Sequence, residues 1–207
     1  IDASHDSEDI QQFREIFVKR LIAYVHALRC HLRNEDPTEA IKQFLPPEDL
    51  TKVLASGHRP LAILHQLGHD LASARDRHWL HELNFPSMDA QLNELSNILG
   101  GCERIKNTPI PFSYSVLIHR IVASYCLFLP FGLVETTGVL TPIVVLLISY
   151  AFFELDAIGD EIENPFGLQP NDLPLTAISR NVEINLLELI NYPDRPAALK
   201  PENDILM

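Results

Sequence analysis

FSYSVLIHRIVASYCLFLPFGLV (residues 112–134) and GVLTPIVVLLISYAFF (residues 138–153) are two apolar segments that decide the fold of this chain. Between Arg120 and Glu154 the only charged residue is Glu135. The hydrocarbon core of a bilayer is about 30 Å thick, and an α-helix needs roughly 20 mostly apolar residues to cross it. The two segments therefore predict a transmembrane helical hairpin.

The charges that flank the hairpin predict its orientation. The short connection at residues 135–138 contains no Lys or Arg, whereas Arg104 and Lys106 precede the first segment. Because basic residues stay on the cytoplasmic side, we expect both flanks in the cytoplasm. This predicts three parts: a cytosolic helical region (1–111), the hairpin (112–153), and a cytosolic helix with a Pro-containing tail (154–207).

Composition excludes several classes of function. The chain has 16 Lys and Arg against 28 Asp and Glu, a formal net charge of −12. Nucleic-acid binding needs a clustered basic face, and this sequence has none. Cys30, Cys102 and Cys126 are far apart and form no CxxC spacing. Neither a disulfide framework nor a structural zinc site is therefore expected, and a reducing compartment fits best.

The flanks of the hairpin have helical periodicity. Apolar residues recur at three- and four-residue steps, the spacing that places them on one face of a helix. No segment has the alternation of a strand, so we expect an all-α protein. The expected helices outside the hairpin cover residues 10–33, 47–56, 61–81, 86–101 and 174–190.

Two prolines lie inside the hairpin. Pro130 and Pro142 are each expected to break one backbone hydrogen bond of a helix. Such breaks are tolerated in a membrane where neighbouring helices or water satisfy the carbonyls. The prolines therefore indicate kinked helices within a larger assembly.

One cluster could bind a metal. His65, His69 and Asp70 include a His-Asp pair that is similar to that of the metal-dependent phosphohydrolases. That chemistry needs ligands that converge from several helices, whereas these residues are neighbours on one helix. We therefore expect no catalytic residue, no cofactor and no metal, and keep this cluster as the alternative of a membrane-bound metal hydrolase.

The most specific motif follows the second apolar segment. EIENPFGLQPNDLPL (residues 161–175) combines NPFG with a following Asp-Leu-Pro-Leu and closely resembles the bestrophin family of ion channels. GCERIKNTPIPFSYSVLIHR (residues 101–120) is similar to the bacterial branch of that family. The order of the expected helices agrees with the family from residue 10 to residue 189.

The resemblance implies a subunit of a homopentameric channel in the bacterial inner membrane, with four membrane helices per subunit around a central pore. Animal members are calcium-activated chloride channels, whereas bacterial members are described as favouring monovalent cations. This chain supplies the last two membrane helices. The first two, with the narrow neck of the pore, would precede Ile1.

The resemblance also implies a degenerate calcium clasp. In animal members, residues around NPFG and an acidic run after it bind calcium; the matching positions here are Glu161, Asn164, Gln169 and Asp172. LQPN at residues 168–171 replaces the acidic run. Calcium prefers six to eight oxygen ligands, several of them carboxylates, so the replacement argues against calcium gating.

A second implied region is the cytosolic constriction of the pore. The family forms it with an apolar side chain at the start of the helix before CERI. The candidates here are Phe85, Pro86 and Met88, with Pro86 at the place where bacterial relatives carry an aliphatic residue. A ring of apolar groups selects ions by their hydration. We expect an aperture that is wider or differently selective than in a relative with isoleucine at this position.

Acidic residues favour cations in a pore. Asp89 and Glu94 are the candidates near the constriction. We therefore predict passive conduction of monovalent ions, favouring cations such as sodium. Two alternatives stay open: an anion (chloride) channel of the same architecture, and a non-conducting membrane scaffold or receptor.

Overall fold

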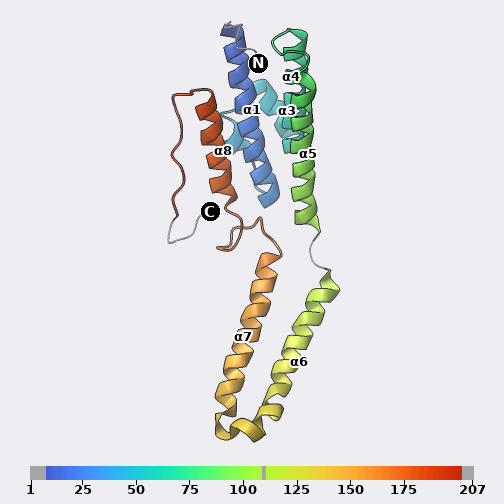
Figure 1. The fold of residues 1–207 in the computed structure, drawn as a ribbon, viewed down its shortest axis with the longest axis vertical. Helices are drawn as coiled ribbons and strands as arrows, with labels where there is room; N and C mark the ends of the chain where they lie inside the picture. Colours follow the sequence, from blue (N-terminus) through green and yellow to red (C-terminus); the bar gives the residue numbers. More distant parts are fainter. Residues whose placement is uncertain (1–7, 109–110, 202–207) are drawn as a thin grey trace. The chain divides into compact units, whose positions relative to one another are not determined.

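A computed structural model describes residues 8–108 and 111–201. Over these residues the protein is helical and contains no strand, which confirms the all-α prediction. The elements are α1 (Glu8–Arg33), α2 (Thr38–Ile41), α3 (Pro47–Ala55), α4 (Arg59–Asp76), α5 (Phe85–Asn107), α6 (Phe112–Thr137), a 3-10 turn η1 (Gly138–Leu140), α7 (Thr141–Ile162) and α8 (Leu175–Leu189) (Figure 1).

The chain forms two compact units. The first contains α1 to α5 and α8, and we call it the bundle unit. The second begins at Lys106, ends at Leu173 and contains α6, η1 and α7; we call it the hairpin unit. The boundary falls in the last turn of α5. The division of the chain by membrane side stays a prediction.

Three helices of the bundle unit end in the same way. Asn34, His78 and Asn191 follow the ends of α1, α4 and α8 with a positive φ of 58°, 58° and 52°. After each, the next amide donates to a carbonyl five residues back; Trp79 N, for example, lies 2.9 Å from Ala74 O. This is the Schellman motif, which satisfies the last carbonyls of a helix.

The boundaries of α4 and α5 differ from the sequence prediction. α4 ends at Asp76 rather than near residue 81, because His78 adopts the left-handed conformation that closes the helix. α5 continues through Gly100 and Gly101 to Asn107 rather than ending at the glycines. Glycine alone does not end a helix when the residues around it are held by tertiary contacts.

The turn of the hairpin corrects the expectation for one proline. α7 begins at Thr141, after η1, so Pro142 is its second residue. The amides of the first helical turn have no partner within the helix, and Pro142 therefore breaks no hydrogen bond. Pro130 does lie inside α6, as predicted.

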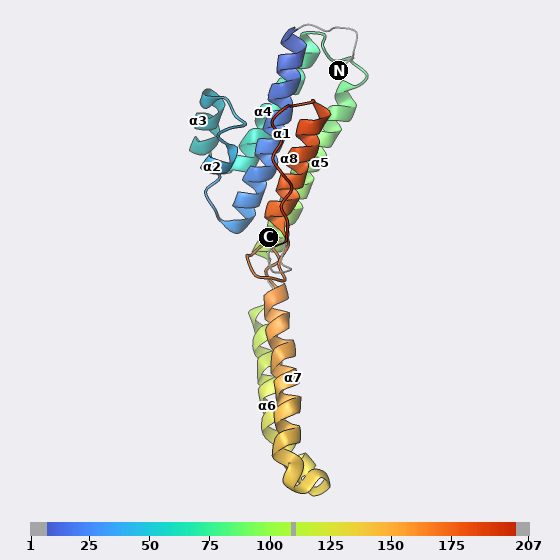
Figure 2. The same cartoon turned by 90° about the vertical axis from the view of Figure 1, so that its left-hand side faces the viewer.

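The core of the bundle unit surrounds α1, which packs against α4 and α8 (Figures 1 and 2). Ile22, Ile63 and Leu67 are fully buried. Tyr24 is also buried, and its hydroxyl donates a hydrogen bond to the carbonyl of Leu95 on α5 at 2.9 Å. Burial raises the pKa of Tyr24 to about 12, so the phenol stays neutral and keeps this bond.

Two sets of polar contacts, one partly buried and one buried, join helices within this unit. Arg20 of α1 bonds to both Asp49 of α3 and Asp70 of α4. His26 of α1 lies with its Nε2 atom 3.0 Å from Glu183 Oε2 of α8. Removing one partner from a buried pair leaves an unpaired polar group, which is costly. These contacts therefore fix how α3, α4 and α8 sit on α1.

Burial lowers the pKa of His26, against the opposing effect of its hydrogen bond to Glu183. The geometry agrees, because the Nδ1 atom of His26 is buried without a hydrogen-bond partner among the described residues. Protonation of His26 would place an unsatisfied N–H there. Arg180 lies 3.5 Å from the same carboxylate, and Arg29 is a further nearby cation that disfavours the imidazolium.

We expect the stability of the protein to fall as pH is lowered through about 6.5, where the imidazole of an unfolded chain titrates. Between that value and the lowered folded pKa, the unfolded state binds more protons, so the free energy of unfolding decreases with decreasing pH. The substitution His26→Gln keeps a donor to Glu183 but has no titrating ring. The variant should lose about 1 kcal/mol at pH 7.5 and show a weaker pH dependence.

Thermal unfolding of wild type and variants in detergent at pH 7.5 and 5.5, followed by circular dichroism, measures this difference. His65→Gln is the matched control, because His65 is exposed on α4. Equal pH dependence in wild type and His26→Gln would contradict the prediction.

Candidate functional site

The hairpin unit exposes an extensive apolar surface. Phe112–Gly159 is long and apolar enough to cross a membrane, by length and composition, and only 6% of its most apolar window is buried. α6 contains no buried residue. Phe112, Leu127, Phe128 and Phe131 of α6 and Leu146 of α7 are more than half exposed. Such a surface is larger than soluble proteins leave open, so lipid or neighbouring helices must cover it.

α6 and α7 lie side by side (Figures 1 and 2). The rings of Tyr125 and Phe152 meet edge to face with centroids 5.1 Å apart. At the turn, the hydroxyls of Thr137 and Thr141 are 2.8 Å apart, and Thr137 Oγ1 also donates to the carbonyl of Leu133. These bonds satisfy polar groups where the chain reverses direction, as a membrane requires.

A polar pair, His119 and Asp156, crosses the hairpin. His119 Nε2 of α6 lies 3.4 Å from Asp156 Oδ2 of α7, and His119 Nδ1 lies 2.6 Å from the carbonyl of Ser115. Arg120 is exposed. Ionisable groups in membrane segments persist when they are paired. The partner of His119, Asp156, lies three residues after the second apolar segment of the sequence.

The loop after α7 brings the four clasp residues together. Glu161, Asn164, Gln169 and Asp172 all line one groove of about 550 Å³ within the hairpin unit. The two carboxylates among them already accept hydrogen bonds from the described chain. Asp172 Oδ2 accepts a hydrogen bond from the amide of Gln169 at 2.6 Å, and Glu161 Oε2 accepts one from Asn171 Nδ2 at 2.9 Å. Their carboxylates therefore organise the loop.

Gly167 makes this loop possible, a role that the NPFG motif alone did not indicate. A Cβ atom at Gly167 would lie 2.4 Å from Asp172 Oδ2 and 3.4 Å from Asn164 Nδ2. The loop also closes through the amide of Leu173, which donates to the carbonyl of Pro165 at 2.9 Å, and Phe166 is buried beneath it. The NPFG motif therefore supplies a turn, a buried ring and a close backbone approach.

The three constriction candidates differ in their surroundings. Phe85 and Met88 are partly buried and pack on the small cluster of Leu71, Ala74 and Leu80. The guanidinium of Arg75 lies 4.7 Å from the centroid of the Phe85 ring. Pro86 is the one exposed residue of the three.

Asp89 and Glu94 are exposed on α5. Their carboxylates accept hydrogen bonds from the amides of Asn93 at 3.3 Å and Asn97 at 3.2 Å, respectively. A helix turns by about 100° per residue, so Asp89 lies about 60° to one side of Pro86 and Glu94 about 80° to the other. Three further exposed residues share the face of Pro86 itself: Asn93, Asn97 and Arg104.

His65, His69 and Asp70 do not converge. The two imidazoles face each other with Nε2 atoms 3.1 Å apart on the surface of α4. The Asp70 carboxylate instead bonds to Arg20 of α1. The hydrolase alternative needs all three side chains on one ion, and among the described residues these three form no such ligand group.

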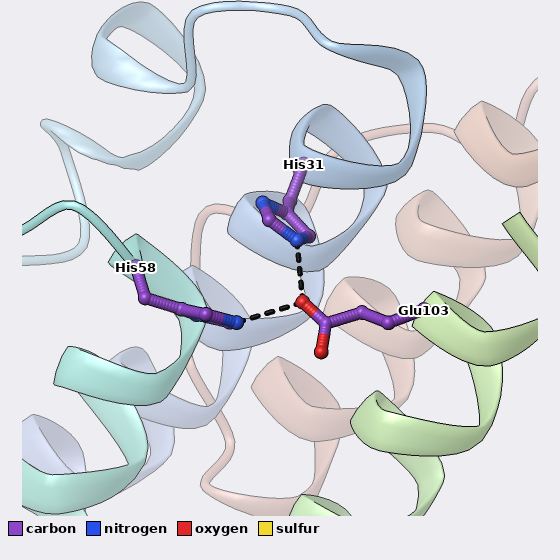
Figure 3. Close-up of side chains that lie close together, drawn as sticks. All are labelled: His31, His58 and Glu103. Atoms are coloured by element: carbon purple, nitrogen blue, oxygen red, sulfur yellow. Dashed lines mark hydrogen bonds and ion pairs between the residues drawn. The ribbon is translucent and has the colours of Figure 1, made fainter. Parts of the chain in front are cut away.

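A different cluster of ligand-type residues is present in the bundle unit (Figure 3). His31 and His58 each place Nε2 at 2.7 Å from the same atom, Oε1 of Glu103. Burial would raise the pKa of Glu103, but the hydrogen bonds from His31 and His58 outweigh it and hold that pKa below its ordinary value. The three residues are far apart in sequence, and no local spacing signals their meeting.

The close approach at Gly167 generates a prediction for the loop after α7. Gly167→Ala places a methyl group against the Asp172 carboxylate, which must move and lose its bond to Gln169. We expect a loss of about 1–3 kcal/mol in the free energy of unfolding, as for overpacking elsewhere. Chemical unfolding of the protein in detergent measures it.

Gly159→Ala is the control, because a Cβ atom at Gly159 on α7 meets nothing within 4 Å. Alanine is the better helix former, so this control should unfold no more easily than wild type. A Gly167→Ala variant as stable as the control would show that the loop accommodates the methyl group.

Sequence and structure comparisons identify relatives over most of the chain. The family described as Bacterial/Fungal Bestrophin protein matches residues 2–188. The chain is 43% identical over 188 residues to the voltage-dependent anion channel-forming protein YneE of Salmonella typhi. It is 41% identical over 197 residues to the protein of the same name from Escherichia coli K12. These matches include 91% and 95% of this chain, respectively.

The chain spans 62% of the length of the Salmonella protein and 64% of that of the E. coli protein. Among solved structures, a bacterial bestrophin homologue from Klebsiella pneumoniae, phased by Zn-SAD, superposes with a TM-score of 0.84 at 37% identity. The superposition includes 89% of this chain and 68% of that one. The chain belongs to the bacterial and fungal bestrophin family.

Proposed function

We propose that this chain is part of a subunit of an oligomeric ion channel in the bacterial inner membrane. The observation that carries the proposal is the exposed apolar hairpin of α6 and α7 in a chain of the bestrophin family. We propose the homopentamer that the family resemblance implies, with ions passing along its axis and no chemical reaction.

The names of the relatives favour anions over the cations that the sequence analysis predicted. Both the Salmonella and the E. coli proteins are named as anion channel-forming. The face of α5 that carries Pro86 supports this reading, since it presents two neutral amides and Arg104, with Asp89 and Glu94 displaced to either side. Rings of basic side chains favour anions in a pore. We therefore propose an anion channel. The overall charge of −12 is the observation that favours the cation alternative.

Pro86 is our proposed constriction residue. It is exposed, whereas Phe85 and Met88 pack against the cluster of their own subunit. We further propose that the loop after α7 is structural and that conduction does not depend on calcium. Support comes from the partners of Glu161 and Asp172, whose carboxylates bond to Asn171 and to the Gln169 amide.

Reversal potentials test the selectivity. The full-length protein that contains this chain is reconstituted in a planar bilayer under a NaCl gradient, with and without calcium. We expect a reversal potential near the chloride equilibrium potential and the same current in both conditions. A reversal near the sodium potential would restore the cation alternative, and silence from verified oligomers would favour a non-conducting scaffold or receptor.

A charge placed at Pro86 tests the constriction. Pro86→Lys would add one cation per subunit to the proposed ring, so the reversal potential should move further toward the chloride potential and the permeability ratio should change severalfold. The matched control is Gln91→Lys, which adds the same charge at an exposed position about 140° around α5. Equal shifts in both variants would assign the effect to general surface charge.

A further inference from the structure

We propose that His31, His58 and Glu103 form a binding site for a zinc ion inside the bundle unit. The three ligand atoms lie within 4.8 Å of one another. They come from three separate helices: His31 from the last turn of α1, His58 from the position before α4, and Glu103 from the C-terminal half of α5 (Figure 3). Convergence from three helices is the arrangement that the pair His65 and His69 lacks.

The donor set selects the class of metal. Two imidazole nitrogens with one carboxylate oxygen suit zinc and related transition ions, with bonds of about 2.0–2.2 Å. Calcium and magnesium prefer oxygen ligands. The side chains of His31, His58 and Glu103 are 31%, 35% and 26% exposed. The site is therefore open enough for a water molecule to complete a four-coordinate ion.

Metal binding requires a small opening of the cluster. Each Nε2 atom lies 2.7 Å from Glu103 Oε1. In a tetrahedral zinc site with bonds of about 2.1 Å, neighbouring ligand atoms are about 3.4 Å apart. An outward movement of less than about 1 Å at each pair makes room for the ion. Because all three side chains are partly exposed, rotamer adjustments can supply this movement.

The protons also balance. Without metal, each histidine donates Nε2–H to the single Glu103 oxygen. A bound ion takes the Nε2 lone pairs, so the proton of each ring moves to Nδ1. For His58 this removes the hydrogen bond that Nδ1 accepts from the amide of Leu61, which is already long at 3.4 Å. The site thus exchanges the two hydrogen bonds to Glu103 and the long bond from Leu61 for three metal bonds.

The consequence is a crosslink between three helices. An ion held by His31, His58 and Glu103 would tie α5 to the C-terminal end of α1 and the N-terminal end of α4. Ligands that bind only the folded state stabilise it by mass action. Zinc should therefore raise the unfolding temperature of the protein.

Calorimetric titration of zinc into the metal-stripped full-length protein in detergent tests the proposal. We expect one saturable site per subunit. Glu103→Gln keeps the size of the side chain but removes its charge. We expect it to weaken the affinity for zinc by roughly a hundredfold, because losing a residue that only supports a metal ligand already weakens metal affinity by up to about that factor. The increase in unfolding temperature with zinc should disappear in the same variant.

The double variant His65→Gln, His69→Gln is the control, because that pair is the other place where two imidazole nitrogens meet in the described chain. It should bind zinc like wild type. If Glu103→Gln does not assemble, His31→Gln replaces it as a second ligand variant. Absence of saturable binding in wild type, unchanged affinity in Glu103→Gln, or loss of binding in the control would each overturn the proposal.

Discussion

The constraint on which the structure depends is the exposed apolar surface of Phe112–Gly159. Contact of side chains such as Phe112 and Phe131 with water is costly in free energy. Within a membrane the backbone must then satisfy its own hydrogen bonds, which limits this segment to helices and a minimal turn. The threonine bonds at the turn and the His119–Asp156 pair follow from the same requirement. The hairpin unit needs partners or lipid, whereas the bundle unit has a core of its own.

Polar contacts, rather than apolar ones alone, define the bundle unit. Apolar packing tolerates small shifts between helices, but a buried charge must meet its partner. Arg20 meets carboxylates from α3 and α4, and His26 meets Glu183 of α8. Misplacing one of these helices would leave a buried polar group unpaired, at a cost of several kcal/mol. Such pairs therefore select one arrangement of the helices on α1.

Local signals predicted most of the elements and little of their interaction. The apolar steps and prolines located α1, α3, α6 and α8 to within a few residues, because helix periodicity and capping are local properties. The end of α4 was missed, since it depends on a histidine in the left-handed conformation. The cluster at Glu103 was missed because its histidines are 72 and 45 residues away in sequence. The clasp positions could be located only through the family resemblance.

Helix α5 shows why tertiary contacts override a local signal. Two adjacent glycines in a helix interior cost about 1 kcal/mol each relative to alanine, and Gly100 and Gly101 would by themselves favour an end to the helix. Leu99 is buried in the main core just before them, and Glu103 is held by two histidines just after them. Contacts on both sides fix the helical path through the glycines. The same helix exposes Pro86 at its other end, so its position relative to α1 and α4 determines where that side chain is presented.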